Sequence, residues 1–169
     1  MERTLIILKP DAVQRGIVGE IVSRFERVGL KIIGTKMLQP DADFYHHHYE
    51  GISQMVSRRG QHAFDVTLDA MQEGPVIAIV LEGVEAVALV RKMVGTTEPK
   101  EALPGTIRGD YAHISFAHAE KRKAGIPNVV HASGNKAEAE QEIVHWFSEA
   151  ELFDYETTHE HLTQGKTKK

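Results

Sequence analysis

The stretch Asn128–Ser133, which reads Asn-Val-Val-His-Ala-Ser, combines residue types that can do chemistry. Its short apolar run is typical of a buried strand, and the run delivers His131 just before turn-forming residues at 133–135. A helical pattern then starts near Lys136 and carries several glutamates, among them Glu142. A histidine between a strand end and such a helix can have one ring nitrogen held while the other faces a cleft, which suits a nucleophile or a proton carrier. The alternative is a packed or surface histidine without a chemical role.

Cationic side chains stand at turns and helix ends elsewhere in the chain. Lys9 ends an apolar run and precedes a proline, so its charged side chain can face a cleft instead of the core. Arg108 lies in the stretch 104–110, where glycines allow close approach of a ligand and the guanidinium can bind two phosphate oxygens. The sequence has no P-loop and no Gly-x-Gly-x-x-Gly motif, so any phosphate would be held by side chains, with Arg91 and Thr97 as further candidates. Each of these residues, taken alone, also fits an ordinary solvated side chain.

The three consecutive histidines at positions 46–48 are the main candidates for metal chemistry. Neighbouring residues point in different directions on a helix, and no His-x-x-x-His pair with a nearby third ligand is evident, so we predict no transition-metal site built by the protein. Mg2+ is a different case, because it often keeps its waters and takes few protein ligands. Nucleotide phosphates can therefore carry it into a site.

Composition excludes several classes of protein. The chain has 169 residues, 41% hydrophobic and 26% charged, which fits a single domain, predicted over residues 1–164, with a disordered basic tail at 165–169. The net charge of -4 gives no indication of a nucleic-acid or membrane partner. No apolar run is long enough to span a bilayer, and the start lacks a signal-peptide pattern. The absence of cysteine suits the cytoplasm.

Alternating strands and helices must position these residues. Continuous apolar runs predict buried strands, and apolar residues at helical spacing predict helices, with Val28 and Val144 facing the core and Trp146 partly so. The strands are expected at 4–9, 30–38, 76–81 and 129–131, the helices at 16–29, 84–94 and 137–149, a helical hairpin within 40–72 and a long loop over 95–110. This order indicates an α+β, ferredoxin-like (βαββαβ) fold, in which helices cover a four-stranded antiparallel sheet.

Several motifs together resemble the nucleoside diphosphate kinase family. In family order they are Thr4–Asp11, Gln14-Arg15-Gly16, Val18-Gly19-Glu20, Gly74-Pro75-Val76, Arg91 with Gly95-Thr96-Thr97, Pro104–Asp110 and Asn128–Ser133. The combination is highly specific, although no single piece is. The resemblance implies a Mg2+-dependent enzyme that moves the γ-phosphoryl group from a nucleoside triphosphate to a nucleoside diphosphate through a phosphohistidine, with ping-pong kinetics. It also implies a homo-oligomer, either a hexamer or a tetramer.

The same resemblance implies roles for individual residues. His131 would be the phosphorylated histidine, oriented by Ser133 and Glu142. The nucleotide would be bound by Lys9, Tyr49, Phe64, Arg91, Thr97, Arg108 and Asn128. Phe64, in the helical hairpin, would stack on the base, and stacking tolerates any base because every base has a π-face.

The sequence departs from the family at three places. Members usually read His-Gly-Ser-Asp, whereas Gly134 stands here after Ser133, so an acidic partner is missing. The hairpin between Tyr49 and Gly74 and the segment 112–127 are both longer than usual, and the second is expected to form a lid or a subunit contact. Two alternatives stay open: a regulatory nucleotide-binding protein that transfers little phosphate, and a protein-interaction module of the same fold.

Overall fold

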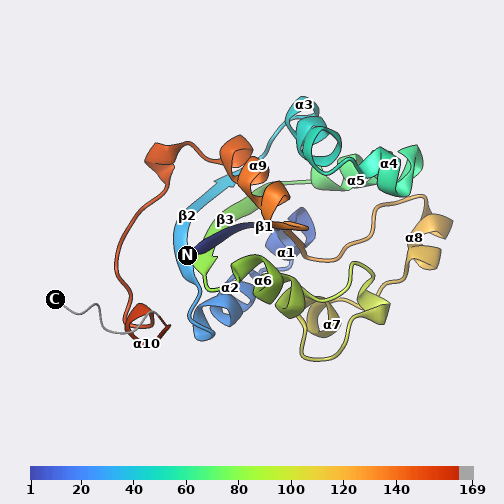
Figure 1. Cartoon of the computed structure of the whole chain (residues 1–169). Coiled ribbons are helices and arrows are strands. Elements are labelled where there is room, and N and C mark those ends of the chain that lie inside the picture. The colour runs from blue at the N-terminus through green and yellow to red at the C-terminus, as the bar shows by residue number, and fades with distance from the viewer. Residues whose placement is uncertain (164–169) are drawn as a thin grey trace.

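The computed structural model describes residues 1–163, and these contain one four-stranded sheet. Its strands are β1 (Glu2–Leu8), β2 (Lys31–Leu38), β3 (Val76–Gly83) and β4 (Val130–Ala132). They lie in the order β2-β3-β1-β4, and every neighbouring pair is antiparallel (Figure 1). The ferredoxin-like fold is therefore confirmed, while the predicted tail at 165–169 lies outside the described residues.

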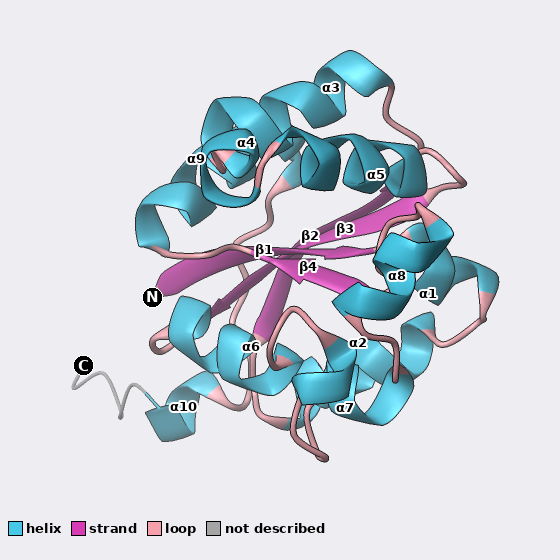
Figure 2. Cartoon of the chain, turned by 90° about the vertical axis from the view of Figure 1, so that its right-hand side faces the viewer, coloured by secondary structure: helices cyan, strands magenta, loops and turns pink. Residues whose placement is uncertain are grey.

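Helices cover both faces of the sheet (Figure 2). They are α1 (Pro10–Gln14), α2 (Val18–Arg27), α3 (Ala42–His46), α4 (Met55–Arg59), α5 (Gln61–Met71), α6 (Ala86–Val94), α7 (Ile107–Tyr111), α8 (Phe116–Arg122), α9 (Lys136–Trp146) and α10 (Glu160–Thr163). A π-helical turn spans His47–Ile52, and 3-10 turns span Pro99–Glu101 and Glu149–Glu151. Within residues 1–163, none of these helices has the length and apolarity that a bilayer crossing requires.

The central strand β1 divides the core into two layers. Leu5 and Ile7 point to the layer beneath α3, α5 and α9, whereas Ile6 and Leu8 point to the layer packed on α2 and α6. Successive side chains of a strand face opposite sides, so a strand covered on both faces needs an unbroken apolar run. That requirement explains the uninterrupted apolar sequence of β1.

Three helix predictions need correction. Val28 is 47% exposed because α2 ends at Arg27 and the chain turns at Gly29, whose φ of +85° suits glycine. Val144 is 80% exposed, whereas Trp146 is only 2% exposed, so the buried face of α9 is rotated from the predicted one. The short helix α7 begins within the predicted long loop 95–110. The segment 112–127, for which no helix was predicted, holds the short helix α8.

Candidate active site

A cavity of about 420 Å³ is lined by the hairpin helices α4 and α5, by α8 and by residues next to β1 and β4. Its lining falls into two parts. The cationic part consists of Lys9, Tyr49, Arg91, Thr97, Arg108, Asn128 and His131, and the apolar part of Ala63, Val66, Phe116, Ala119 and Ile126. A cavity with a positive part and an apolar part suits a ligand with a charged group and a flat apolar group.

The backbone before His131 is strained. Val129 has a φ of +61°, which is rare for a β-branched residue, and the Val130 N–H donates to the carbonyl of Asn128 at 2.7 Å, closing a γ-turn. The Val129 N–H donates to Asp11 Oδ2 at 3.1 Å, and its carbonyl accepts from the Lys9 N–H at 2.9 Å. Such strain costs about 1–3 kcal/mol and persists only where surrounding contacts enforce it. Here those contacts fix where β4 begins and hence where His131 points.

His131 is held through one of its ring nitrogens. Its Nε2 lies 3.0 Å from Glu142 Oε1, and Ser133 Oγ donates to Glu142 Oε2 at 2.5 Å. Burial opposes the charge on Glu142, but the positive charge that His131 carries when it is protonated, its hydrogen bond, the charge of a protonated His48 and the Ser133 hydrogen bond outweigh it and lower the pKa of Glu142 to about 2. An ionised Glu142 accepts from Nε2–H, so the proton is on Nε2. Among the described residues no group hydrogen-bonds to Nδ1, and His131 lines the cavity.

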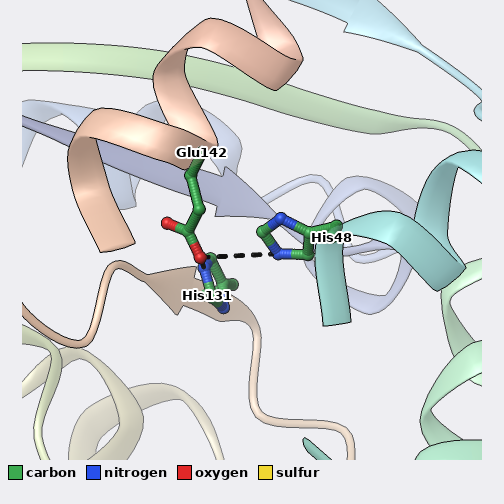
Figure 3. Close-up of side chains that lie close together, drawn as sticks. All are labelled: His48, His131 and Glu142. Atoms are coloured by element: carbon green, nitrogen blue, oxygen red, sulfur yellow. Dashed lines mark hydrogen bonds and ion pairs between the residues drawn. The ribbon is translucent and has the colours of Figure 1, made fainter. Parts of the chain in front are cut away.

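His48 completes a cluster with His131 and Glu142 (Figure 3), in which one ligand atom of each lies within 4.8 Å of the others. This spacing could suit a metal, but the tautomer of His48 does not. Trp146 Nε1–H, which can only donate, bonds to His48 Nδ1 at 3.1 Å, so the proton of the neutral ring is on Nε2. Burial and the proximity of His131 lower the pKa of His48 well below its usual value, which keeps the ring neutral. Its Nε2–H therefore points toward Glu142 Oε1, 3.8 Å away, and is not free to bind a metal through a lone pair.

Arg108 is the most firmly held cation. Its guanidinium donates to the carbonyls of Gly95 at 2.9 Å, Val130 at 2.7 Å and Asn128 at 3.3 Å. Burial, with the nearby charges of Arg91 and Arg59, lowers the pKa of Arg108 to about 10, so it remains charged at neutral pH. No carboxylate among the described residues pairs with it, which leaves its charge available to an anion.

Lys9 and Asn128 support each other beside Arg108. Lys9 Nζ donates to Asn128 Oδ1 at 2.7 Å, and Asn128 Nδ2 donates to the carbonyl of Thr97 at 2.8 Å. Burial and the charge of Arg108 lower the pKa of Lys9 to about 8. Nearby, the Tyr49 hydroxyl is buried without a hydrogen-bond partner within residues 1–163, and burial raises its pKa, so it stays a donor. Unsatisfied donors around a positive pocket are what a phosphate chain requires.

Residues 2–152 match the family model described as nucleoside diphosphate kinase. The chain belongs to the nucleoside diphosphate kinase family. A nucleoside diphosphate kinase of Borreliella burgdorferi is 44% identical over 92% of this chain and 92% of its own length. A nucleoside diphosphate kinase of Pyrococcus horikoshii is 48% identical over 91% and 90%. Family membership makes the chain a phosphotransferase that acts on nucleotides.

Solved structures of nucleoside diphosphate kinases have the same fold. The Borrelia burgdorferi enzyme, a transition-state mimic with bound vanadate and ADP, matches with a TM-score of 0.92 and 43% identity over 95% of both chains. The Halobacterium salinarum enzyme, in complex with CDP, matches with a TM-score of 0.81 and 36% identity over 95% of this chain and 97% of its own.

Within this nucleoside diphosphate kinase fold, the predicted stacking of the base on Phe64 needs correction. Phe64 is 4% exposed, packs in the core layer beneath α5 and does not line the cavity. The aromatic ring at the apolar part is Phe116 of α8, which is 41% exposed. All the other residues predicted to bind the nucleotide lie in the cationic part, with Ser133 and Glu142 directly behind His131.

Two residues that line the cavity were not predicted from the sequence. Arg59 lines the cavity, and its Nη2 donates to Thr97 Oγ1 at 3.3 Å. The other is Phe116, whereas His48 had been considered only as a candidate metal ligand. The adjacent basic pair Arg58-Arg59 beside Gly60 was a usable signal for Arg59, whereas the segment that holds Phe116 has no periodic pattern.

Proposed function

We propose that His131 Nδ1 is the nucleophile of a ping-pong transfer. In the first half, Nδ1 bonds to the γ-phosphorus of a nucleoside triphosphate while the bond from that phosphorus to the bridging β-phosphate oxygen breaks, and the nucleoside diphosphate leaves. In the second half, a terminal oxygen of another nucleoside diphosphate attacks the phosphorus and the N–P bond breaks. The supporting observation is that Glu142 holds Nε2 and leaves Nδ1 open to a cationic cavity. Glu142 also offsets the positive charge that develops on the ring.

The nucleotide lies along the cavity in this proposal. Its phosphates take the cationic part, where Arg108, Lys9 and Tyr49 donate to oxygens that gain charge in the transition state. Its base takes the apolar part, between α5 and Phe116. The ADP and CDP complexes of the two structural relatives support a nucleotide site in this fold.

Members of the family use a divalent metal, and we propose Mg2+ here. The donor set fits a metal held by the substrate, because the two carboxylates that line the cavity, Glu120 and Glu138, are paired with His62 and Arg58, and the phosphates themselves offer the hard oxygen ligands. When bound, the ion neutralises phosphate charge. The residues Lys9, Arg91 and Arg108 supply the remaining positive charge.

The experiment that tests the function is incubation with labelled ATP followed by acid and base treatment. We expect a phosphate on the protein that is labile to acid and stable to base, and its discharge on adding a nucleoside diphosphate. Nucleotide binding without this adduct would favour the regulatory alternative, and no nucleotide binding would favour the interaction module.

Replacing the exposed ring at the apolar part should weaken binding. We expect Phe116→Ala to cost about 1–3 kcal/mol of nucleotide binding free energy, because one base-stacking contact is lost. Calorimetric titration with ADP measures this. Phe64→Leu is the matched control, since that ring is in the core: it should lower the unfolding midpoint and leave ADP affinity of the folded protein unchanged. Unchanged ADP affinity in Phe116→Ala together with weakened affinity in Phe64→Leu would indicate that Phe64 stacks on the base.

Lys9 predicts an alkaline limit to activity. Its pKa of about 8 means that the side chain is charged below pH 8 and neutral above it, so phosphate attraction falls as pH rises through 8. We expect kcat/KM, which reports the free enzyme, to decline above about pH 8, and kcat to decline only at higher pH because bound phosphates favour the charged form. Lys9→Arg should remove this decline. If kcat/KM of that variant still fell above about pH 8, the decline would be due to another titrating group.

We also propose a cytoplasmic homo-oligomer, hexamer or tetramer, on the basis of the family resemblance. The solvent-exposed Leu103 and Val144 leave apolar surface that a subunit contact could cover. Light scattering coupled to size exclusion distinguishes the two assemblies from a monomer.

A further inference from the structure

Gly134 and Glu138 compete for one volume beside the active site. A Cβ at Gly134 would lie 2.5 Å from Glu138 Oε2, closer than real contacts allow. The Glu138 side chain is buried in the first turn of α9 and is held there by Asn135, whose Nδ2 donates to Oε1 at 2.8 Å and whose Oδ1 accepts from the Glu138 N–H at 2.9 Å. The carboxylate thus fills the space where a side chain at position 134 would lie.

The partner of this carboxylate is Arg58, which forms an ion pair with Glu138 Oε1. Arg58 is in α4, none of whose residues is fully buried. Met55 and Val56 pack against one core layer, and the Val56 N–H donates to Glu50 Oε2 at 2.8 Å, whereas the Arg58 side chain is half exposed. Met55, Arg58 and Arg59 nevertheless form one wall of the cavity, and Glu138 lines it too. The ion pair therefore fixes the half-exposed Arg58 side chain of this wall to α9, the helix that carries Glu142.

We infer that Glu138 is a positioning residue for phosphoryl transfer, which takes the place of the acidic residue absent at Gly134 and holds Arg58 and α4 against the nucleotide cavity. This inference rests on the proposed function. Without the carboxylate, the Arg58 side chain loses its tie to α9 and the nucleotide meets a less ordered wall at this point, while His131 and Glu142 keep their geometry. The loss should therefore appear in KM more than in kcat. Either position 134 or position 138 should be able to supply the carboxylate, but not both together.

The test is a swap of the carboxylate between the two positions. We expect Glu138→Ala to raise KM for a nucleoside diphosphate about tenfold and to lower kcat by less than about threefold. Adding Gly134→Asp to Glu138→Ala should return KM to within about threefold of wild type. Gly134→Asp alone should raise KM, since two carboxylates then crowd one volume. An unchanged KM in Glu138→Ala, or a double variant no better than the single one, would overturn the inference.

Two further variants separate positioning from general stability. Glu138→Gln keeps the shape and removes only the charge, so it should raise KM with an unchanged unfolding midpoint. Glu140→Ala, on the exposed side of the same helix, should leave KM and kcat as in wild type. ADP affinity is measured by calorimetry alongside the kinetics. If the wild-type protein transferred no phosphate, the proposed function would fall, yet the ADP titrations of the same variants would still decide the role of Glu138.

Discussion

His131→Ala is expected to reduce phosphoryl transfer below about one-thousandth of the wild-type rate, because the variant has no group that can carry the phosphoryl between the two substrates. Among the described residues of the cationic part of the cavity, His131 is the only imidazole, and its Nδ1 has a free lone pair and an orientation fixed by Glu142. A coupled assay with ATP and a second nucleoside diphosphate measures the rate, and the acid-labile adduct should vanish with it.

Nucleotide affinity should stay within about threefold in His131→Ala, because Lys9, Arg108 and Tyr49, which we propose as the phosphate-binding residues, are unchanged. His161→Ala, at an exposed histidine of α10, is the matched control and should transfer phosphate normally. Normal turnover by His131→Ala would remove the assignment of the nucleophile. A large loss of ADP affinity would instead indicate that the imidazole holds the phosphates in the ground state.

The sheet and the link between His131 and its helix could be predicted because local patterns specify them. The unbroken apolar run of β1 requires a strand covered on both faces, and β4 leads into α9 through only a short turn. Because that connection is so short, Glu142 is expected near His131 even without knowledge of the tertiary contacts of other segments. The choice of ring nitrogen could not be predicted, since it depends on the rotation of α9 about its axis.

Side-chain direction on a helix was the least predictable feature. Ala63 lines the cavity while its neighbour Phe64 lies in the core, because one residue along a helix rotates the side chain by about 100°. An insertion of uncertain position in the hairpin is therefore enough to exchange the two. In α9, Val144 and Trp146 are two residues apart, which rotates the side chain by about 200°, so Trp146 is buried where Val144 is exposed. Phe116 lies in an aperiodic segment, and its contacts are with residues distant in sequence: its N–H donates to Glu98 Oε1, and Arg59 lies over its ring. Its place at the cavity therefore follows only from the tertiary structure.

Replacing the Glu142 carboxylate should slow phosphoryl transfer without weakening nucleotide binding. Glu142→Gln keeps the shape, so Nε2–H of His131 can still donate to the amide oxygen and Ser133 Oγ can accept from the amide nitrogen. What is lost is the negative charge, which opposes the positive charge that develops as Nδ1 bonds to phosphorus. We expect kcat to fall by about 10²–10⁴-fold while the KM for nucleotide changes little. Stopped-flow measurement of phosphohistidine formation isolates this step.

Ser133→Ala is the variant with which Glu142→Gln should be compared, because it leaves the Glu142 carboxylate in place. It removes one hydrogen bond to Glu142 Oε2 and keeps the charge, so its effect on kcat should be far smaller. If both variants lost the same activity, the role of Glu142 would be to fix the orientation of the ring, and the charge itself would matter little. A loss confined to Glu142→Gln would instead identify the carboxylate charge as the source of the rate. In that case the pKa of about 2 has a functional consequence, because Glu142 stays ionised at neutral pH and well below it.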